Sequence, residues 1–273
     1  MNTREEWFNR AKVLWRRVQR LAGLWWLEAQ RFLRGVPWGR VRPGWYLMGA
    51  LVLYSIFASI QWRGAVADLE LSKAKLEVFE EAALLENAKL SLPLVGARFP
   101  TSADNLPNAP RVYRRGVSQG FVFTGVDAGV QVQFGMPVLA VADAKVKLLT
   151  SNFKELTPKE FQALLQKVKD GASQNDLNLL RGRQVSLLHS NGVITKYGHL
   201  SSINPNLTYA SEIKRGDIIG FVGNSGTLDG TRGTKNNARL LFEIWLENET
   251  KFFGAGLTPD AVRREVAKII KMP

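Results

Sequence analysis

A run of twenty residues without a charged side chain, from Pro43 to Trp62, constrains this chain more than any other feature. At about 1.5 Å per residue, a helix of that length matches the roughly 30 Å hydrocarbon core of a bilayer. Trp45 and Tyr46 at one end and Trp62 at the other suit the two membrane interfaces, where aromatic side chains accumulate. We therefore predict a transmembrane helix over residues 43–62.

Charge is distributed unevenly around this segment. Residues 1–43 contain ten Lys/Arg and three Asp/Glu, residues 63–90 four and six, and residues 91–273 twenty-three and fifteen, which gives net charges of +7, −2 and +8. Because basic residues accumulate on the cytoplasmic side, we expect a single-pass protein with a cytoplasmic N-terminus and an extracytoplasmic C-terminal part. The stretch Ala65-Val66-Ala67 could be a signal-peptidase site, but a full-length apolar run behind so long a leader favours a retained anchor.

The basic balance does not by itself identify a partner. No zinc knuckle, RNP-type aromatic strand or helix-turn-helix signal accompanies it, so we do not expect nucleic acid binding. The absence of cysteine excludes disulfides and thiolate metal sites. A hydrophobic content of 45% is ordinary for a chain that buries a core.

Helices are predicted on both sides of the span. Residues 1–42 carry apolar side chains at steps of three and four with arginines largely off that stripe, which is typical of an amphipathic helix on an anionic leaflet or on a partner's membrane helices. Residues 63–90 favour a helical stalk or a short coiled coil. Their heptad positions are Leu69, Leu76, Ala83 and Leu90. Oligomerisation through 66–90 and packing of a single stalk on its own domain both remain open.

A β domain is predicted after this stalk. Four prolines within residues 91–116 indicate an extended linker that wraps or leads into the next domain. Short apolar runs separated by glycines then predict a mainly β, antiparallel domain over residues 117–257. The expected strands lie around Val122 and at 138–141, 146–149, 184–188, 193–197, 218–222 and 240–246.

Two helices interrupt and close this domain. Thr157-Pro158-Lys159-Glu160 predicts a capped helix start inside an insertion at about 151–182, with a stop at Gly171. The polar residues 170–178 are expected to form a mobile loop. Thr258-Pro259-Asp260 predicts a last helix within 258–273. Its inward side chains are expected to be Val262, Val266, Ile269 and Ile270.

Motifs occur in a defined order along the β region. They are Phe123-Thr-Gly-Val-Asp127, Gly135-Met-Pro-Val-Leu-Ala-Val-Ala-Asp-Ala-Lys-Val146, His189-Ser-Asn-Gly-Val-Ile-Thr-Lys-Tyr-Gly-His199-Leu200, Lys214-Arg-Gly-Asp-Ile-Ile-Gly-Phe-Val-Gly-Asn-Ser-Gly226 and Arg239-Leu-Leu-Phe-Glu243. Together they resemble the LytM/lysostaphin-like zinc endopeptidases, a duplicated hybrid motif family that cuts peptidoglycan cross-links. The resemblance covers roughly residues 117–255 and implies a LytM-like antiparallel sheet and a bacterial envelope context.

The resemblance also maps the family's catalytic groups onto this chain. The three zinc ligands correspond to Phe123, Asp127 and Leu241, so two of the three are replaced by apolar side chains. The two histidines that handle the proton correspond to His199 and Arg239, and an arginine with a pKa above about 12 cannot act as a base near neutral pH. With only two histidines in the chain, no triple-histidine site can form elsewhere. We therefore predict no cofactor, no metal and no catalysis.

The altered site remains a candidate binding groove. Its expected members are Phe123, Asp127, Tyr197, His199, Arg239 and Leu241. We expect Asp127 to pair with Arg239, and His199 to make a structural hydrogen bond or contact a ligand. Phe123 and Leu241 are expected to fill the groove as core or to line a ligand pocket.

The resemblance implies a function for a chain of this composition. We expect a non-catalytic interaction module in the bacterial inner membrane that regulates a cell-wall hydrolase, as non-catalytic relatives do in cell division, or scaffolds an envelope-spanning complex, as in the sporulation channel. The expected partners are proteins of the cell envelope. The C-terminal domain is expected to be periplasmic or extracytoplasmic. A peptidoglycan-binding module, whose basic domain is attracted to an anionic wall, is the alternative, and an active zinc endopeptidase with a divergent site is a further one.

Overall fold

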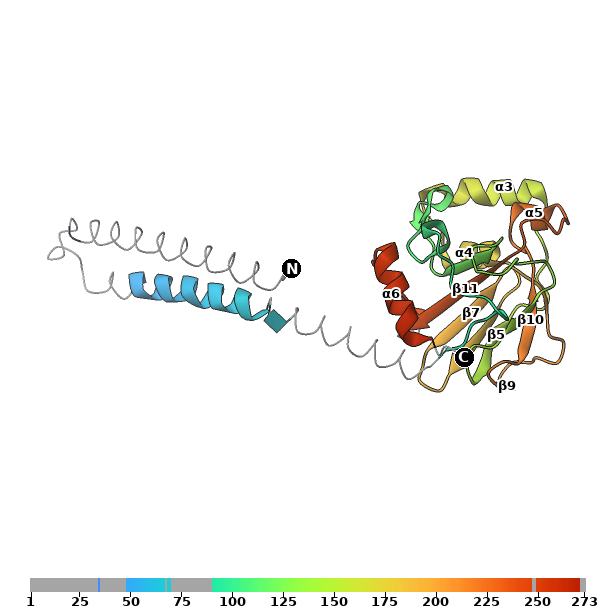
Figure 1. The fold of residues 1–273 in the computed structure, drawn as a ribbon. Helices are drawn as coiled ribbons and strands as arrows, with labels where there is room; N and C mark the ends of the chain where they lie inside the picture. The colour runs from blue at the N-terminus through green and yellow to red at the C-terminus, as the bar shows by residue number, and fades with distance from the viewer. Residues whose placement is uncertain (1–33, 35–47, 67, 70–89, 247–248, 271–273) are drawn as a thin grey trace, which may run out of the picture. The chain divides into compact units, whose positions relative to one another are not determined.

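The computed structural model describes residue 34 and residues 48–66, 68–69, 90–246 and 249–270. The chain divides into two compact units, residues 1–73 and 74–273. In the first, residues 48–66 form a helix with exposed side chains, blue in Figure 1. No helix among the described residues combines the length and apolar character needed to cross a membrane. Residues 43–47 of the predicted span lie outside the described residues, so the span stays a prediction.

Most of the predicted N-terminal and stalk helices also lie outside the described residues. These are residues 1–42, apart from residue 34, and residues 70–89. The amphipathic helix, the heptad stalk and its oligomerisation therefore stay predictions.

The second unit is mainly antiparallel β. Its strands are β1 (Pro110–Arg111), β2 (Gly116–Val117), β3 (Phe121–Thr124), β4 (Pro137–Leu139), β5 (Ala144–Leu149), β6 (Val185–His189), β7 (Ile194–Gly198), β8 (Leu200–Ile203), β9 (Glu212–Ile213), β10 (Ile218–Val222), β11 (Arg239–Leu246) and β12 (Lys251–Phe252). The largest sheet runs β12-β11-β7-β6-β5-β9, with β3 also paired to β11. A second sheet runs β4-β10-β8, and β1 pairs with β2. Every predicted strand is present within a few residues.

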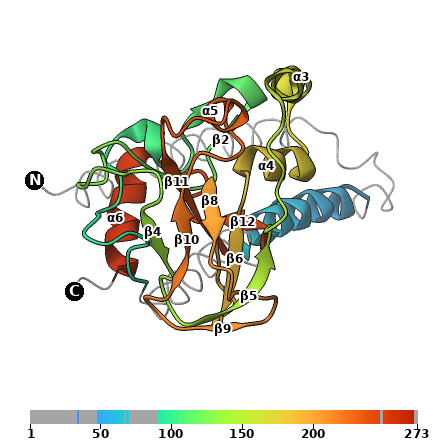
Figure 2. The same cartoon turned by 90° about the vertical axis from the view of Figure 1, so that its right-hand side faces the viewer.

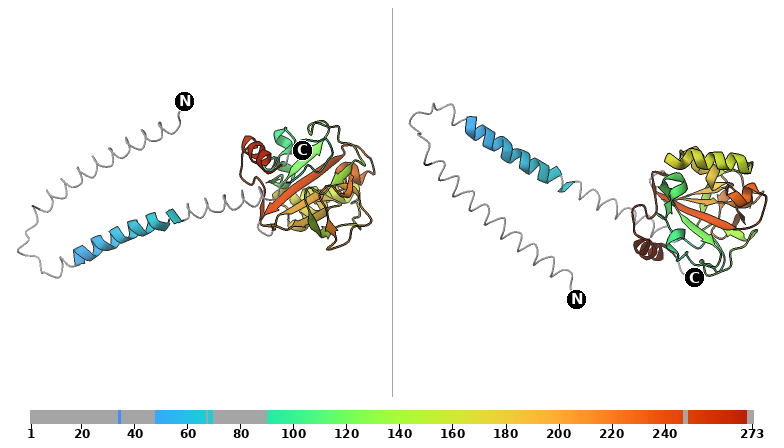
Figure 3. Two further views of the ribbon diagram at one scale, coloured as in Figure 1. Left: turned by 60° about the horizontal axis from the view of Figure 1, so that its bottom comes forward. Right: turned by 90° about the horizontal axis from the view of Figure 1, so that it is seen from above.

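The helices of this unit are shorter than the helix at residues 48–66, and they lie around the sheets. They are η2 (Ala103–Asn105), η3 (Val112–Arg114), α3 (Pro158–Lys167), η4 (Val168–Asp170), α4 (Gln174–Arg181), α5 (Leu228–Thr231) and α6 (Pro259–Ile269). Figure 2 shows α3 and α4 next to one another, and Figure 3 shows α6 on a different side of the domain from α3.

Strand β11 determines which residues face the core. Side chains alternate along a strand, and Leu240, Phe242 and Ile244 are buried in the main hydrophobic cluster. Antiparallel pairing with β3 sets Leu240 opposite Phe123 and Leu241 opposite Val122. Phe123 therefore points into the core, and the opposite face of the two strands carries Arg239, Leu241 and Glu243 together with Val122 and Thr124.

The core extends beyond the boundaries expected from the sequence. Leu90, Leu94 and Leu106 are fully buried in the same cluster as the strands. Phe99 packs edge-on against Phe121, with ring centroids 4.5 Å apart. Residues 90–116 thus wrap the sheet and belong to the domain, because their apolar side chains complete its core. At the other end, α6 buries the expected Val262, Val266 and Ile269 in that cluster, whereas Ile270 is only partly buried.

The helical insertion begins as predicted. The Thr157 hydroxyl accepts a hydrogen bond from the Glu160 amide, and the Glu160 carboxylate accepts one from the Thr157 amide at 2.7 Å. This capping box satisfies two amides that the first turn of α3 would otherwise leave without partners. The helical segment then ends at Gly171.

The loop expected at residues 170–178 is a wrong prediction. After Gly171 the chain enters α4, whose first turn has a second capping box between Ser173 and Asp176. The same Ser-x-x-acidic spacing is visible in the sequence and could have predicted this start. Leu180 on α4 packs with α3 in a small separate core.

Candidate functional site

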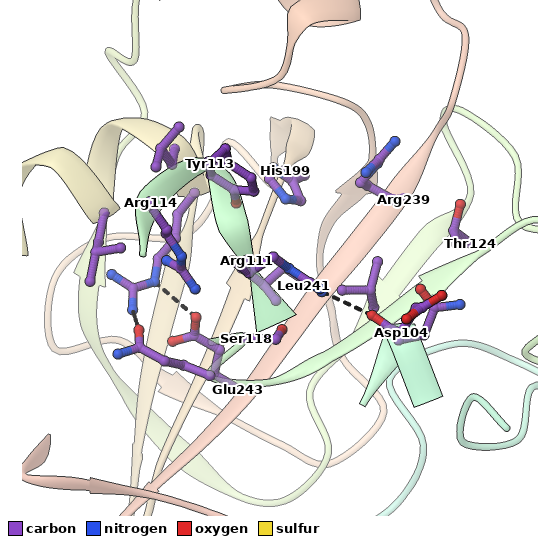
Figure 4. A pocket seen from close by; sticks show the side chains of 16 residues that line it. Asp104, Arg111, Tyr113, Arg114, Ser118, Thr124, His199, Arg239, Leu241 and Glu243 are labelled. Atoms are coloured by element: carbon purple, nitrogen blue, oxygen red, sulfur yellow. Dashed lines mark hydrogen bonds and ion pairs between the residues drawn. The ribbon is translucent and has the colours of Figure 1, made fainter. Parts of the chain in front are cut away.

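A cavity of about 320 Å³ opens on the face of β11 that points away from the core (Figure 4). Four parts of the chain line it: the wrapping segment, the β3–β11 pair, helix α4, and the corner between β7 and β8. Its lining residues are Asp104, Asn105, Arg111, Tyr113, Arg114, Ser118, Gln119, Val122, Thr124, Leu177, Leu180, Arg181, His199, Arg239, Leu241 and Glu243. The wrapping segment and the insertion, rather than the motif strands alone, therefore shape the site.

Only part of the predicted groove lies in this cavity. His199, Arg239 and Leu241 line it. Phe123 and Tyr197 do not, because both are fully buried in the core. The Tyr197 hydroxyl accepts a hydrogen bond from the Val141 amide, and burial raises the pKa of Tyr197 far above its ordinary value. Of the two roles expected for Phe123, the structure therefore supports the core role and not the role of lining a ligand pocket.

The predicted ion pair between Asp127 and Arg239 is wrong. The Asp127 carboxylate instead accepts hydrogen bonds from the Thr101 amide and hydroxyl, the Ser102 amide and the Asn105 side chain, at 2.7 to 3.2 Å. Partial burial raises the pKa of Asp127, but these hydrogen bonds outweigh burial and hold the pKa below its ordinary value. The wrapping segment brings these donors to Asp127 from about 25 residues upstream, so Asp127 anchors that segment.

Arg239 extends into the cavity without a carboxylate partner among the described residues. Its Nε donates to the Asn237 carbonyl at 3.1 Å. Burial lowers the pKa of Arg239, Asp229 partly offsets that effect, and the positive charge of Arg111 lowers the pKa further. The guanidinium is thus a partly buried cation whose hydrogen bond goes to a backbone carbonyl.

His199 has an unusual backbone and a defined protonation state. Its φ of 61° is in the left-handed region, which non-glycine residues seldom adopt. The backbone amide donates to the Arg181 carbonyl at 2.7 Å, and Nδ1 donates to the Ser225 carbonyl at 2.8 Å. Burial, with Arg239 and Arg181 nearby, lowers the pKa of His199 to about 4, although the Ser225 bond favours the charged form. The ring is therefore neutral at pH 7, with Nε2 as an acceptor.

Two further arginines come from the segment that the sequence suggested to be a linker. Arg111 donates to the Asp104 carbonyl at 3.0 Å and to the Pro110 carbonyl at 3.2 Å. Arg114 donates from Nη2 to the Val117 carbonyl, while its Nε is buried and has no partner in the part of the chain that the structure describes. Burial lowers the pKa of Arg114, Tyr113 partly offsets that, and Arg111 lowers it further.

Sequence reasoning missed these two arginines. Their visible signal is the basic and aromatic run Arg111-Val-Tyr-Arg-Arg115 inside a proline-rich stretch.

A buried ion pair closes the inner wall of the cavity. Arg181 of α4 and Glu243 of β11 are 4% and 3% exposed, and their Nε and Oε1 atoms lie 3.0 Å apart. The Trp245 indole donates to the other Glu243 oxygen at 2.7 Å. Arg181 also donates to Gln119 at 2.7 Å and to Asn178 at 3.1 Å. The pair attaches the insertion to the sheet, and both charges are satisfied internally.

The residues present do not fit the zinc ion of the resembled family. A catalytic zinc is held by three His, Cys, Asp or Glu side chains. Within residues 34, 48–66, 68–69, 90–246 and 249–270, no group of three such side chains could hold a metal ion. At the positions that the resemblance maps to metal ligands, Leu241 offers no lone pair and Asp127 is engaged outside the cavity.

Comparison with known proteins agrees with the fold. Residues 165–252 match the sequence model described as Peptidase family M23, so an M23-type domain includes this region. No curated protein matches the chain.

Three solved structures are similar to parts of the chain. A zinc-containing peptidase from Vibrio cholerae is 19% identical with a TM-score of 0.39, over 60% of this chain and 39% of that one. The catalytic domain of the prophage-encoded M23 protein EnpA from Enterococcus faecalis is 17% identical with a TM-score of 0.38, over 63% and 96%. The catalytic domain of lysostaphin from Staphylococcus simulans is 19% identical with a TM-score of 0.32, over 62% and 91%. The chain thus spans about two fifths of the Vibrio cholerae peptidase.

Proposed function

We propose that this chain is a non-catalytic, membrane-anchored interaction module of the bacterial cell envelope. Its M23-type domain binds a protein partner: a cell-wall hydrolase that it regulates, or a subunit of an envelope-spanning complex that it scaffolds. One observation carries the proposal. The cavity on β11 is lined by Leu241 and Arg239, where the resemblance places a metal ligand and a proton-transfer residue.

The chemistry of the cavity supports binding over hydrolysis. Metal-dependent peptide hydrolysis needs an activated water and a group that takes up a proton. Leu241 can bind no metal, and Arg239 remains protonated even though burial lowers its pKa. Of the two positions that the resemblance assigns to proton transfer, only His199 could accept a proton, and a pKa of about 4 makes it a weak base. What the cavity retains is a shaped surface of cationic and apolar side chains.

The proposed location rests on the sequence. The uncharged residues 43–62 and the basic segment before them would place the M23-type domain outside the cytoplasm. Because the chain has no cysteine, single introduced thiols can test this. Labelling of intact spheroplasts with a membrane-impermeant maleimide should modify Tyr209→Cys, a residue that is 77% exposed, and spare Asn2→Cys. The reverse pattern would contradict the orientation.

Catalysis and partner binding can be tested separately on the full chain. The protein purified in detergent should release no product from cross-linked muropeptides, with or without added zinc, and turnover that a chelator abolishes would refute the proposal. A photo-cross-linking amino acid in place of Tyr113, at the cavity rim, should give a discrete protein adduct in living cells. The same probe in place of Tyr209 is the matched control, since Tyr209 is an exposed tyrosine outside the cavity. Adducts of equal yield at both positions would indicate non-specific contact.

A second candidate function is peptidoglycan binding. It is favoured by the net charge of +8 over residues 91–273, since a basic surface attracts an anionic wall. Pelleting with purified sacculi across a salt series separates the two functions. Retention that disappears with rising salt indicates non-specific attraction, and retention at high salt would favour wall binding over a protein partner.

A further inference from the structure

Three arginines from two parts of the chain line the cavity. Arg111 lies on β1, Arg114 on η3 and Arg239 on β11 (Figure 4). We propose that these arginines form a carboxylate-binding site, which recognises an Asp or Glu side chain on an extended acidic peptide of the protein partner. This inference rests on the proposed function. The wrapping segment supplies two of the three arginines, and only Arg239 belongs to a family motif.

Protein groups use only part of the hydrogen-bonding capacity of these half-buried side chains. A guanidinium has five N–H donors. Arg111 and Arg239 donate only to backbone carbonyls, at 3.0 to 3.2 Å. Arg114 makes one such bond, and its buried Nε has no partner among the described residues. A buried donor without an acceptor is costly, so an incoming carboxylate would satisfy donors that the protein itself leaves unpaired.

The charges of the cavity also call for an anion. After the effect of burial, the positive charge of Arg111 contributes to lowering the pKa of both Arg114 and Arg239, so Arg111 is close enough to repel each of them, and Asp229 partly offsets the effect at Arg239. Glu243 offsets the effect at Arg114 only in part, and its carboxylate oxygens accept hydrogen bonds from Arg181 and Trp245. Asp104 is the other carboxylate in the lining, and it lies at the exposed edge.

The other lining residues favour a peptide side chain over a bare inorganic anion. Val122, Leu177 and Leu241 provide an apolar wall that suits the methylene groups of a glutamate. A guanidinium fork matches the planar geometry of its carboxylate. The Nε2 of neutral His199 can accept a backbone N–H from the same peptide. A cavity of about 320 Å³ accommodates one or two side chains rather than a folded surface.

Fluorescence anisotropy with the full chain in detergent tests the site. The probe is a labelled acetyl-Gly-Gly-Glu-Leu-Glu-Gly-Gly amide, and the Gln-for-Glu analogue is its neutral match. The acidic peptide should bind at least about tenfold more tightly, since each lost charged hydrogen bond costs about that factor or more. Arg239→Gln and Arg114→Gln should each weaken binding about 10- to 100-fold. Arg239→Lys should weaken it as well, because lysine keeps the charge but lacks the fork.

Arg264→Gln is the matched control, because Arg264 is an exposed arginine on α6 and its loss changes the net charge equally. It should alter binding less than about twofold, as expected for a screened surface charge. An equal loss in this control, equal binding of the neutral peptide, or tighter binding of inorganic phosphate or of a monomeric muropeptide would overturn the proposal. Thermal unfolding of every variant identifies any that fail to fold.

A competition experiment on the wild-type protein needs no arginine variant. The acidic peptide should suppress the photo-adduct formed from position Tyr113, and the neutral peptide should leave it intact. If the adduct forms and the acidic peptide does not compete, the carboxylate site is refuted and the interaction module stands. If the protein cleaves muropeptides, the proposed function itself fails.

Discussion

The buried pair between Arg181 and Glu243 gives a quantitative test of how the insertion is joined to the sheet. Replacement of Arg181 by methionine keeps most of the side-chain volume but removes its contacts with Glu243, Gln119 and Asn178. Glu243, which is 2% exposed, is left with the Trp245 indole alone. Removal of one member of a buried pair costs about 3–5 kcal/mol because the remaining charge stays buried. At about 2–4 °C per kcal/mol, the midpoint of thermal unfolding should fall by roughly 6–20 °C.

Urea unfolding of the full chain in detergent, followed by tryptophan fluorescence, measures this loss. The double variant Arg181→Met with Glu243→Gln should recover a large part of it, with a coupling energy of about 2–3 kcal/mol. Lys268→Met is the control, since Lys268 pairs with Glu265 at the surface and its loss should cost at most about 1 kcal/mol. If Arg181→Met costs no more than this control, or if the two losses simply add, the buried pair does not hold α4 on the sheet.

Four further predictions follow from single residues. Because the folded-state pKa of His199, about 4, is below the ordinary 6.5, the unfolded state binds the proton first, and stability is lost as the pH falls from about 6.5 toward 4. Between pH 7 and 4.5, the wild type should lose roughly 2–3 kcal/mol more than His199→Asn, which tolerates the same backbone; equal urea midpoint shifts would contradict this. In the same urea assay, Gly182→Ala should lower the free energy of unfolding by at least about 1 kcal/mol more than Gly192→Ala. A Cβ at Gly182 would lie 2.4 Å from the Ser225 backbone, whereas a Cβ at Gly192 would meet no atom within 4 Å. Thr157→Ala should cost about 1 kcal/mol, seen as faster amide exchange in α3, and unchanged exchange would show that the capping box is dispensable. Arg239→Leu should raise the free energy of urea unfolding by roughly 0.5–2 kcal/mol while it abolishes binding of the acidic peptide, and a drop in stability would show that the arginine is structural.

The elements that could be predicted from the sequence are those with local signals. The capping box at Thr157 and the Thr258-Pro259 start of α6 each depend on residues within one helical turn, and both helices begin there. The strand candidates rest on short apolar runs bounded by glycines, and these runs form strands of the sheets. The same kind of signal at Ser173 was available and gives α4 its start.

Three predicted residues, His199, Arg239 and Leu241, do line the cavity, but the rest of the site could not be predicted because it depends on contacts between distant residues. A motif match gives the position of a residue along the sequence. The register of strand pairing decides which face of the sheet its side chain occupies. The β3–β11 register sets Val122 opposite Leu241 and turns Phe123 into the core. Asp127 finds its partners through the path of the wrapping segment, and Arg114 enters the cavity by that path too.

A cavity lined by arginines that have no carboxylate partner lowers the stability of the fold. Arg114 and Arg239 lose hydration and are repelled by Arg111, and no carboxylate from the described residues pairs with any of the three. The nearby Arg181 and Glu243 show what an internally stable arrangement looks like, with each charge opposed and hydrogen-bonded. The three arginines and the Arg181–Glu243 pair line the same cavity. The cavity can therefore hold a carboxylate beside an arginine, yet Arg111, Arg114 and Arg239 have none in the part of the chain that the structure describes. Unpaired cations beside a satisfied pair are expected where the missing anion comes from another molecule, and stability is sacrificed for binding.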